Sequence, residues 1–415
     1  MKYPSYTGFR CVRCGNTYPV EPFRYQCDSC SSNLDIQYDY NGIKNAWSRN
    51  SLKNNKDRSL YRFLPLLPID RQPDNRSIQV GGTPLVRMKE PLNNDRSYEL
   101  YLKDDTRNPS GSLKDRATEI GLIHAKNLNY DKVIAASTGN AAASLAALSA
   151  FHGMQAVILT PKNAPLAKLV QILQYGATLI PIDGSYDDAF DLSIEAVKEF
   201  GFYSRNTGFN PIMSEGKKTV ILEIMEQLNW KIPDRVYVPV GDGCIIGSVY
   251  KGLYDLLQLG WISKIPMIIA VQATGSMAIV NALDSSNNLE PVKSNTIADS
   301  IAVDFPRDGL KAIKAVHKSG GYGIAVEDDE ILSAQKMLSS QSGIFSEPAA
   351  AAAFAGFIQD VEEGKINDGE RIVTLITGTG LKDITAAQRK LVIPDPVKPD
   401  IKALKHVIQQ ISDLT

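Results

Sequence analysis

The clearest pattern along the chain is an alternation of short apolar runs with longer segments whose apolar residues recur at helical spacing. In the stretch between residues 130 and 200, the apolar runs predict strands and the spaced segments predict helices. The predicted strands are 132–136, 155–160 and 177–182, and the predicted helices are 141–151, 165–175 and 186–200. Strands that alternate with helices predict an α/β fold with mostly parallel sheets and helices on both faces.

The same alternation returns around this stretch. The additional predicted strands are 98–103, 235–240, 267–273 and 371–375. The additional predicted helices are 117–128, one that begins near Gly247, one from Ser276, 330–340, and a short amphipathic helix after Pro394. Residues 33–76 are polar and irregular and predict a connector with one short helix.

Length decides how these elements divide. A chain of 415 residues is too long for one ordinary core, so we expect two open, doubly wound α/β domains and a small appendage. The expected division is a ribbon-like segment at 1–40, a larger domain from 41–125 and 206–395, a smaller α/β domain at 126–205, and a tail helix at 396–415.

Composition and charge restrict the partners. The chain is 43% hydrophobic and 22% charged, as in ordinary globular proteins, and its net charge is −1. A charge so close to zero gives no reason to expect nucleic acid or an anionic membrane as a partner. No apolar run is long enough to span a membrane and the polar N-terminus does not resemble a signal peptide, so a cytoplasmic location is expected.

Four of the five cysteines form two pairs, Cys11-x-x-Cys14 and Cys27-x-x-Cys30. Two such pairs separated by a short segment match the four thiolate ligands of structural Zn²⁺. Four protein ligands leave no open position on the metal, so the site would be structural rather than catalytic. Reduced thiols or two disulfides are the alternatives. Cys244 stands alone and is expected to be a small buried side chain.

The candidate for chemistry lies in the segment N-P-S-G-S-L-K-D-R-A-T, residues 108–118. Ser112 and Asp115 have the spacing of a capping box, which places Lys114 in the first turn of the following helix. The positive end of the helix dipole disfavours a charged lysine there and lowers its pKa, which suits a lysine that forms a Schiff base. The alternative is an ordinary exposed lysine.

Two loops between a strand and a helix could bind anions. The first, S-T-G-N at 137–140, presents hydroxyl and N–H donors at a helix N-terminus. The second, V-P-V-G-D-G-C-I-I-G at 238–247, has glycines that let backbone N–H groups approach a phosphate. An ordinary helix cap and an ordinary tight turn are the alternatives.

The lysine segment resembles the cofactor-lysine segment of the fold-type II pyridoxal-phosphate enzymes, and within them the threonine synthases. Four other segments in family order add to the resemblance: G-G-T-P-L at 81–85, S-T-G-N at 137–140, E-G-K-K-T at 215–219 and T-G-T-G-L-K-D at 377–383. The resemblance implies that Lys114 carries pyridoxal 5′-phosphate and acts as the catalytic base. It also implies roles for other residues: Ser137, Thr138 and Gly139 for the substrate carboxylate; Asn140 and Thr377 for the cofactor ring; and Gly241, Asp242, Gly243, Cys244 and Ile245 for the cofactor phosphate.

The implied reaction is γ-elimination of phosphate from O-phospho-L-homoserine and addition of water to give L-threonine. A hydroxyl at Thr377, in place of the carboxylate that aminotransferases use, favours elimination and replacement. One departure matters, because Met213 stands where the family has an arginine that clamps the substrate phosphate. Arg205, Lys217 and Lys218 are the candidates to replace it.

Two other functions remain open. The first is β-elimination or β-replacement on serine, threonine or an O-phosphoserine-like substrate, since Met213 cannot bind a phosphate. The second is a non-catalytic binding protein on the same scaffold. Family habit implies a homodimer that acts on a small amino acid.

Overall fold

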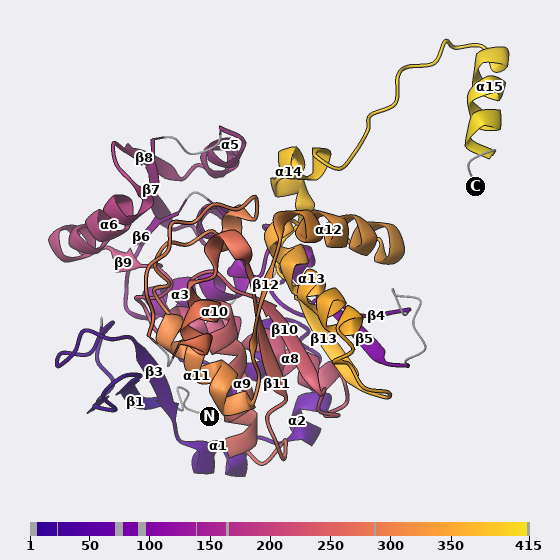
Figure 1. The fold of residues 1–415 in the computed structure, drawn as a ribbon. Coiled ribbons are helices and arrows are strands. Elements are labelled where there is room, and N and C mark those ends of the chain that lie inside the picture. Colours follow the sequence, from indigo (N-terminus) through magenta and orange to yellow (C-terminus); the bar gives the residue numbers. More distant parts are fainter. Residues whose placement is uncertain are drawn as a thin grey trace.

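The computed structural model describes residues 6–22, 24–70, 78–89, 97–137, 139–162, 166–285 and 288–412. Three sheets organise these residues, one antiparallel and two mostly parallel (Figure 1). Helices pack against the parallel sheets, so the expected mostly parallel α/β architecture is confirmed. None of the described helices is both long and apolar enough to cross a lipid bilayer.

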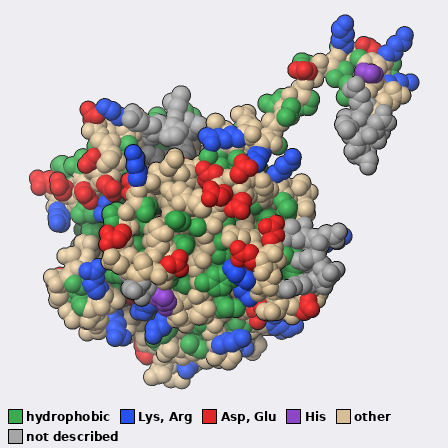
Figure 2. Space-filling view, in the orientation of Figure 1, with side chains coloured by type: hydrophobic (Ala, Val, Ile, Leu, Met, Phe, Trp, Pro, Cys, Tyr) green, Lys and Arg blue, Asp and Glu red, His purple; other side chains and the backbone are tan. Residues whose placement is uncertain are grey.

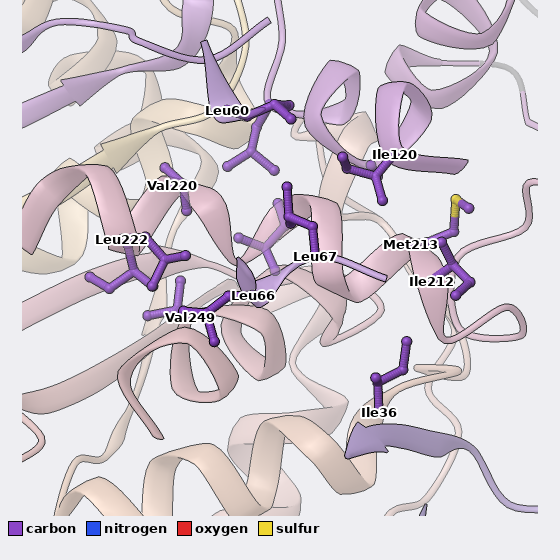
Figure 3. Close-up of a cluster of buried hydrophobic side chains, with 14 of the residues drawn as sticks. Ile36, Leu60, Leu66, Leu67, Ile120, Ile212, Met213, Val220, Leu222 and Val249 are labelled. Atoms are coloured by element: carbon purple, nitrogen blue, oxygen red, sulfur yellow. The ribbon is translucent and has the colours of Figure 1, made fainter. Parts of the chain in front are cut away.

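The N-terminal sheet has three antiparallel strands in the order β2-β1-β3. They are β1 (Tyr6–Cys11), β2 (Thr17–Tyr18) and β3 (Leu34–Tyr38). After them come α1 (Tyr40–Ala46), α2 (Arg49–Lys53) and a 3-10 helix, η1 (Leu60–Leu66). The expectation of one short helix between residues 33 and 76 was therefore too simple. Pro65 lies inside η1, and Leu60, Leu66 and Leu67 insert among the helices of the main body (Figure 3).

The larger sheet has six strands in the order β12-β11-β10-β13-β5-β4, and only the edge strand β4 is antiparallel to its neighbour. The strands are β4 (Leu85–Met88), β5 (Glu99–Asp104), β10 (Arg235–Pro239), β11 (Met267–Ala273), β12 (Gly323–Val326) and β13 (Arg371–Ile376). Side chains of β10 alternate between two cores: Val236 and Val238 pack into one and Tyr237 into the other. Both faces of this sheet are therefore covered.

The helices around the larger sheet fall into two groups. One group shares its core with Val236: α3 (Lys114–Asn127), α7 (Ile212–Lys217), α8 (Thr219–Gln227), α9 (Cys244–Gln258) and α11 (Gly309–Ser319). The other group shares its core with Tyr237: α12 (Asp328–Ser342) and α13 (Pro348–Glu362). Helix α10 (Ala278–Asp284) and the 3-10 helices η2 (Asp105–Arg107), η3 (Thr274–Ser276) and η4 (Asp299–Ile301) connect strands.

The smaller sheet is parallel, with four strands in the order β8-β7-β6-β9. They are β6 (Lys132–Ala136), β7 (Gln155–Pro161), β8 (Thr178–Ile182) and β9 (Tyr203–Ser204). The helices between them are α4 (Asn140–His152), α5 (Leu166–Gln174) and α6 (Tyr186–Phe200). The chain closes with η5 (Gly380–Lys382), α14 (Ile384–Gln388) and α15 (Ile401–Ser412), and the last of these projects from the body (Figures 1 and 2).

Most predicted elements were found within a few residues of their expected bounds. Strands 132–136 and 267–273 and helix 186–200 have the predicted bounds. Two helices begin about three residues earlier than predicted, α3 at Lys114 rather than 117 and α9 at Cys244 rather than near Gly247. In α9 the reason is local, because Gly243 takes a left-handed conformation with φ 86° and turns the chain directly into the helix.

Candidate active site

A cleft of about 380 Å³ lies where the two parallel sheets meet. The turns that leave the C-terminal ends of β6, β10 and β13 all contribute to it, as expected for a ligand site in an open parallel α/β structure. The structure brings ten residues predicted from the sequence to this one cleft: Lys114, Ser137, Gly139, Asn140, Gly241, Asp242, Gly243, Cys244, Ile245 and Thr377. Thr138 lies outside the described residues.

Lys114 is the first residue of α3, and the turn before it is attached to the end of β13. The backbone N–H of Leu113 donates to the carbonyl of Thr377 over 2.9 Å, and Ser112 pairs with Gly378. Gly111 has φ 78°, a conformation that favours glycine. These contacts fix the backbone of Lys114 beside Thr377, although the two residues lie far apart in the sequence.

The predicted capping box at the start of α3 was wrong. Helix α3 has no side-chain cap, because the Asp115 carboxylate instead accepts hydrogen bonds from Ser110 N (2.7 Å) and Ser110 Oγ (2.5 Å). Ser112 Oγ is buried and has no hydrogen-bond partner among the described residues. The first N–H groups of α3 are therefore left without a side-chain acceptor, next to Lys114.

Burial lowers the pKa of Lys114 below its ordinary value, and the nearby charge of Arg205 lowers it further. The carboxylates of Glu347 and Asp242 and the Cys244 thiol oppose the shift. A lysine with a lowered pKa offers more free amine at neutral pH, which is the form that attacks an aldehyde.

Glu347 lies across the cleft and accepts hydrogen bonds from two neighbouring side chains. Asn140 Nδ2 donates to both carboxylate oxygens of Glu347, over 2.8 and 3.0 Å, and Ser300 Oγ donates to one of them over 3.2 Å. Residue 347 was not among the candidates from the sequence, but its side chain is buried and lines the cleft. Its partner Asn140 lies 207 residues away, and no local pattern indicates that contact.

The glycine loop before α9 forms the third wall. Gly241 and Gly243 have no room for side chains, since a Cβ atom would lie 2.9 Å from Ile301 Cα or 2.8 Å from Asp308 O. The loop delivers the N-terminus of α9, with its unpaired N–H groups, to the cleft. Asp242 Oδ1 accepts from Arg307 N over 3.2 Å, and burial raises the pKa of Asp242, which favours its neutral form.

These groups fit pyridoxal phosphate. A buried lysine amine, a helix N-terminus with a glycine turn, an amide at Asn140 and a hydroxyl at Thr377 match an aldehyde, a phosphate, a phenolic oxygen and a pyridine nitrogen. The volume is also that of a small-molecule site.

Comparison with known proteins agrees with the geometry. Residues 76–378 match the family model described as pyridoxal-phosphate dependent enzyme. Over 405 residues the chain is 40% identical to threonine synthase from Methanocaldococcus jannaschii, covering 97% of this chain and 99% of that protein. It is 36% identical over 402 residues to threonine synthase from Methanosarcina acetivorans, covering 96% and 98%.

The chain belongs to the threonine synthase family of pyridoxal-phosphate-dependent enzymes.

Solved structures agree on the fold. Threonine deaminase isoform 2 from Solanum lycopersicum has a TM-score of 0.63 at 22% identity, covering 75% of this chain and 88% of that one. An L-serine ammonia-lyase from Rhizomucor miehei has a TM-score of 0.65 at 21% identity, covering 75% and 98%. At such identities the likeness concerns the fold alone, which is that of the fold-type II enzymes expected from the sequence.

Other threonine synthases are expected to bind the substrate phosphate with an arginine at the position of Met213, so the locations of Met213 and of the three candidate cations matter. Met213 is fully buried in a cluster of hydrophobic side chains (Figure 3). It packs against Gly121 of α3 and does not line the cleft. Lys218 also lies away from the cleft, in ion pairs with Glu215 and Asp255. Arg205 and Lys217 do line it, so two of the three candidate cations reach the site.

Asn33, in the N-terminal cysteine segment, is connected to the glycine loop through Asp308. Asn33 Nδ2 donates to Asp308 Oδ1 (2.5 Å) and to Arg307 O (2.8 Å). Asp308 N in turn donates to Asp242 O over 2.8 Å. The N-terminal sheet therefore supports the loop that is expected to hold the cofactor phosphate in this family.

Replacement of Asn33 by alanine is therefore expected to weaken pyridoxal-phosphate binding. Loss of a hydrogen bond to a charged group costs about 1.5–3 kcal/mol. If roughly half of this free energy is lost from cofactor binding at the loop, the dissociation constant of the cofactor rises up to about tenfold. Titration of apoenzyme with cofactor measures it. Asn16→Ala is the matched control, because the Asn16 side chain donates to Ser29 Oγ within the segment. Equal affinity of both variants and wild type would contradict this support.

Proposed function

We propose that the protein is a threonine synthase, which converts O-phospho-L-homoserine and water to L-threonine and phosphate with pyridoxal phosphate as cofactor. The observation that carries the proposal is the match to threonine synthases over nearly the full length of both chains. The cleft supports it, because a lysine, two anion-binding turns and a ring-binding pair converge there.

The residues predicted from the sequence to line the cleft each have a role in this proposal. The bound cofactor supplies an electron sink for the pair left behind when a proton leaves the substrate α carbon. Lys114 would hold the cofactor through its amine and, as the general base, would take first the α proton and then a β proton of the substrate. Asn140 would donate to the cofactor's phenolic oxygen in place of one of its bonds to Glu347, and Thr377 Oγ1 would bond the pyridine nitrogen. The backbone N–H groups of residues 241–245 hold the cofactor phosphate.

The substrate's own groups take the remaining sites. Ser137, Thr138 and Gly139 bind the α-carboxylate at the N-terminus of α4, where helix N–H groups have no side-chain acceptor. Ser137 Oγ already accepts from Gly139 N over 3.2 Å, so its hydrogen is free to donate. Cleavage of the Cγ–O bond would release phosphate, the γ carbon would take up a proton to become the methyl group, water would add at the β carbon, and a proton would return to the α carbon to give L-threonine.

A product assay on a small panel tests this function. Wild-type holoenzyme should release inorganic phosphate and L-threonine in equal amounts from O-phospho-L-homoserine. Serine, threonine and O-phosphoserine are the matched substrates for β-elimination. Release of a keto acid with ammonia from one of them, without threonine from O-phosphohomoserine, would favour the β-elimination alternative. No turnover and no yellow colour would favour the non-catalytic alternative.

The proposal includes a structural Zn²⁺ held by Cys11, Cys14, Cys27 and Cys30. Their four sulfur atoms lie within 4.8 Å of one another, a spacing that suits a tetrahedral thiolate site.

The proposal also includes the domain division expected from the sequence, a homodimer and a cytoplasmic location. Sedimentation at several concentrations tests the dimer.

Metal analysis is expected to find one zinc per chain. Because each cysteine supplies one of four ligands, Cys11→Ser should reduce the zinc content to less than about a tenth under dialysis against a chelator. Cys244→Ser removes the remaining thiol, which lies outside the cluster, and should keep the metal. Zinc-free wild type, or full zinc in Cys11→Ser, would contradict the metal site.

A further inference from the structure

Arg205 and Lys217 are two buried cations that share one hydroxyl in the cleft. Their side chains are 1% and 0% exposed, and both line the cavity. Thr207 Oγ1 accepts from Arg205 Nη1 over 2.9 Å and from Lys217 Nζ over 3.1 Å. Arg205 also donates to Thr118 Oγ1 (3.1 Å) and to the carbonyl of Lys114 (3.3 Å). All these acceptors are neutral.

Other buried cations among the described residues have a carboxylate as a partner. Arg116, Lys103 and Lys218 each form an ion pair with a buried carboxylate, at 2.7, 2.8 and 2.6 Å respectively. Within the residues that the structure describes, Arg205 and Lys217 have no such pair. Burying a charge without a counter-charge is costly, so a fold that neutralises its other buried cations has left these two for an anion from outside.

The arginine that would bind the substrate phosphate in this family is missing here, because Met213 stands at its position. In this chain the side chain at 213 packs into the core against α3 and does not line the cleft. Arg205 follows β9 and Lys217 ends α7, so two different elements deliver positive charge to the same place. A phosphate monoester is the small dianion that the proposed reaction brings to this cleft, and a guanidinium with an ammonium and a hydroxyl provides its usual donors.

We propose that Arg205, Thr207 and Lys217 form the receptor for the substrate phosphate and replace the arginine that the family uses. This inference rests on the proposed function and names the residues that make the enzyme specific for a phosphorylated substrate. Both cations approach the Thr207 oxygen as donors, so its hydrogen is free to point at a phosphate oxygen. Arg205 also bonds the carbonyl of Lys114, which places the receptor next to the catalytic lysine.

The surroundings of Lys217 predict how kcat/KM should depend on pH. Burial lowers the pKa of Lys217 to about 7, and Arg205 and Lys114 lower it too, whereas the Cys244 thiol and Asp308 act in the opposite direction. The protonated amine binds a dianion, so kcat/KM for the phosphorylated substrate should fall as the pH rises through this pKa. Lys217→Arg keeps its charge at higher pH and should move that fall to more alkaline values.

The test is steady-state kinetics of the holoenzyme with O-phospho-L-homoserine, together with cofactor titration. Lys217→Met keeps the length of the side chain and removes the charge, so KM should rise between about tenfold and a hundredfold. Inhibition by inorganic phosphate should weaken in parallel, while cofactor affinity stays within about threefold. Lys132→Met, at the exposed start of β6, is the matched control and should behave as wild type.

Other outcomes separate the possibilities. If Lys217→Met loses cofactor affinity at unchanged KM, the cluster serves the cofactor phosphate and the inference is wrong. If wild type makes threonine and the variant keeps both KM and phosphate inhibition, the inference fails while the proposed function stands. If wild type makes no threonine, the proposed function itself fails. Should Lys217→Met not fold, Thr207→Val replaces it and should raise KM several-fold; an unchanged KM there would equally overturn the receptor.

Discussion

Replacing Lys114 by alanine is expected to abolish turnover, with a fall in kcat of more than about a thousandfold. In the proposed mechanism the substitution removes both the amine that bonds the cofactor and the general base, and a positioned base alone contributes about 10²–10⁴ in rate. The variant should also lose the visible absorbance of cofactor bound to lysine. Activity and absorbance spectra of purified holoenzyme measure the two effects.

The control for this prediction comes from the second lysine of the cleft. Lys217 is also buried with a lowered pKa, so burial alone does not distinguish it from Lys114. Lys114 begins α3, where the helix dipole disfavours a charged amine, whereas Lys217 ends α7. Lys217→Met should therefore keep the visible absorbance. Retained absorbance and activity in Lys114→Ala would contradict the assignment.

The largest effect on stability is expected from Arg116→Met. The Arg116 side chain is fully buried, two residues after Lys114, and donates to Asp105 and Glu223. Two further bonds, from Nη2 to Asp105 Oδ1 and to Glu223 Oε2, are both 2.8 Å. Removing one partner of a buried ion pair leaves uncompensated charge and costs about 3–5 kcal/mol. Equilibrium unfolding in urea measures the loss.

The matched control is Arg107→Met. Arg107 pairs with Asp104 over 3.2 Å, but its side chain is 68% exposed. Surface pairs contribute less than about 1 kcal/mol, so this variant should unfold close to wild type. A similar small loss in both variants would mean that the buried network of Arg116 contributes little to stability.

The same network predicts a pH dependence of stability. Burial would raise the pKa of Glu223, but the charges of Arg116 and Lys103 outweigh it and hold that pKa well below its ordinary value. A carboxylate with a lowered pKa stabilises the fold above the unfolded value of about 4, and this contribution is lost as the pH falls below it. The stability difference between wild type and Arg116→Met should therefore narrow below about pH 4.

Local patterns in the sequence predicted most strands of the two parallel sheets, Lys114 and the two candidate anion-binding turns, whereas Thr377 and the roles of the cleft residues came from the family resemblance alone. The strand at 132–136, the helix that carries Lys114 and the two anion-binding turns each depend on neighbouring residues, so periodicity, glycines and turn residues were enough to place them. Bringing these turns together follows from parallel topology, since strand C-terminal ends share one edge of each sheet.

The choice between neighbouring partners, and contacts between distant residues, could not be predicted in this way. The Asp115 carboxylate had two acceptable partners, Ser112 in a capping box and Ser110 in the turn, and only the packed turn favours Ser110. The bond from Asn140 to Glu347 joins two helix starts on opposite sides of the cleft. The direction of Met213 depends on the absence of a side chain at Gly121, on another helix.

The proposed function depends on the covalent attachment of the cofactor to Lys114. Borohydride reduces the bond between cofactor and lysine to a stable amine, so peptide mass spectrometry of reduced holoenzyme identifies the lysine directly. The account predicts a single modified peptide, with the cofactor mass on Lys114. Cofactor on Lys217, or on a lysine outside the cleft, would contradict it.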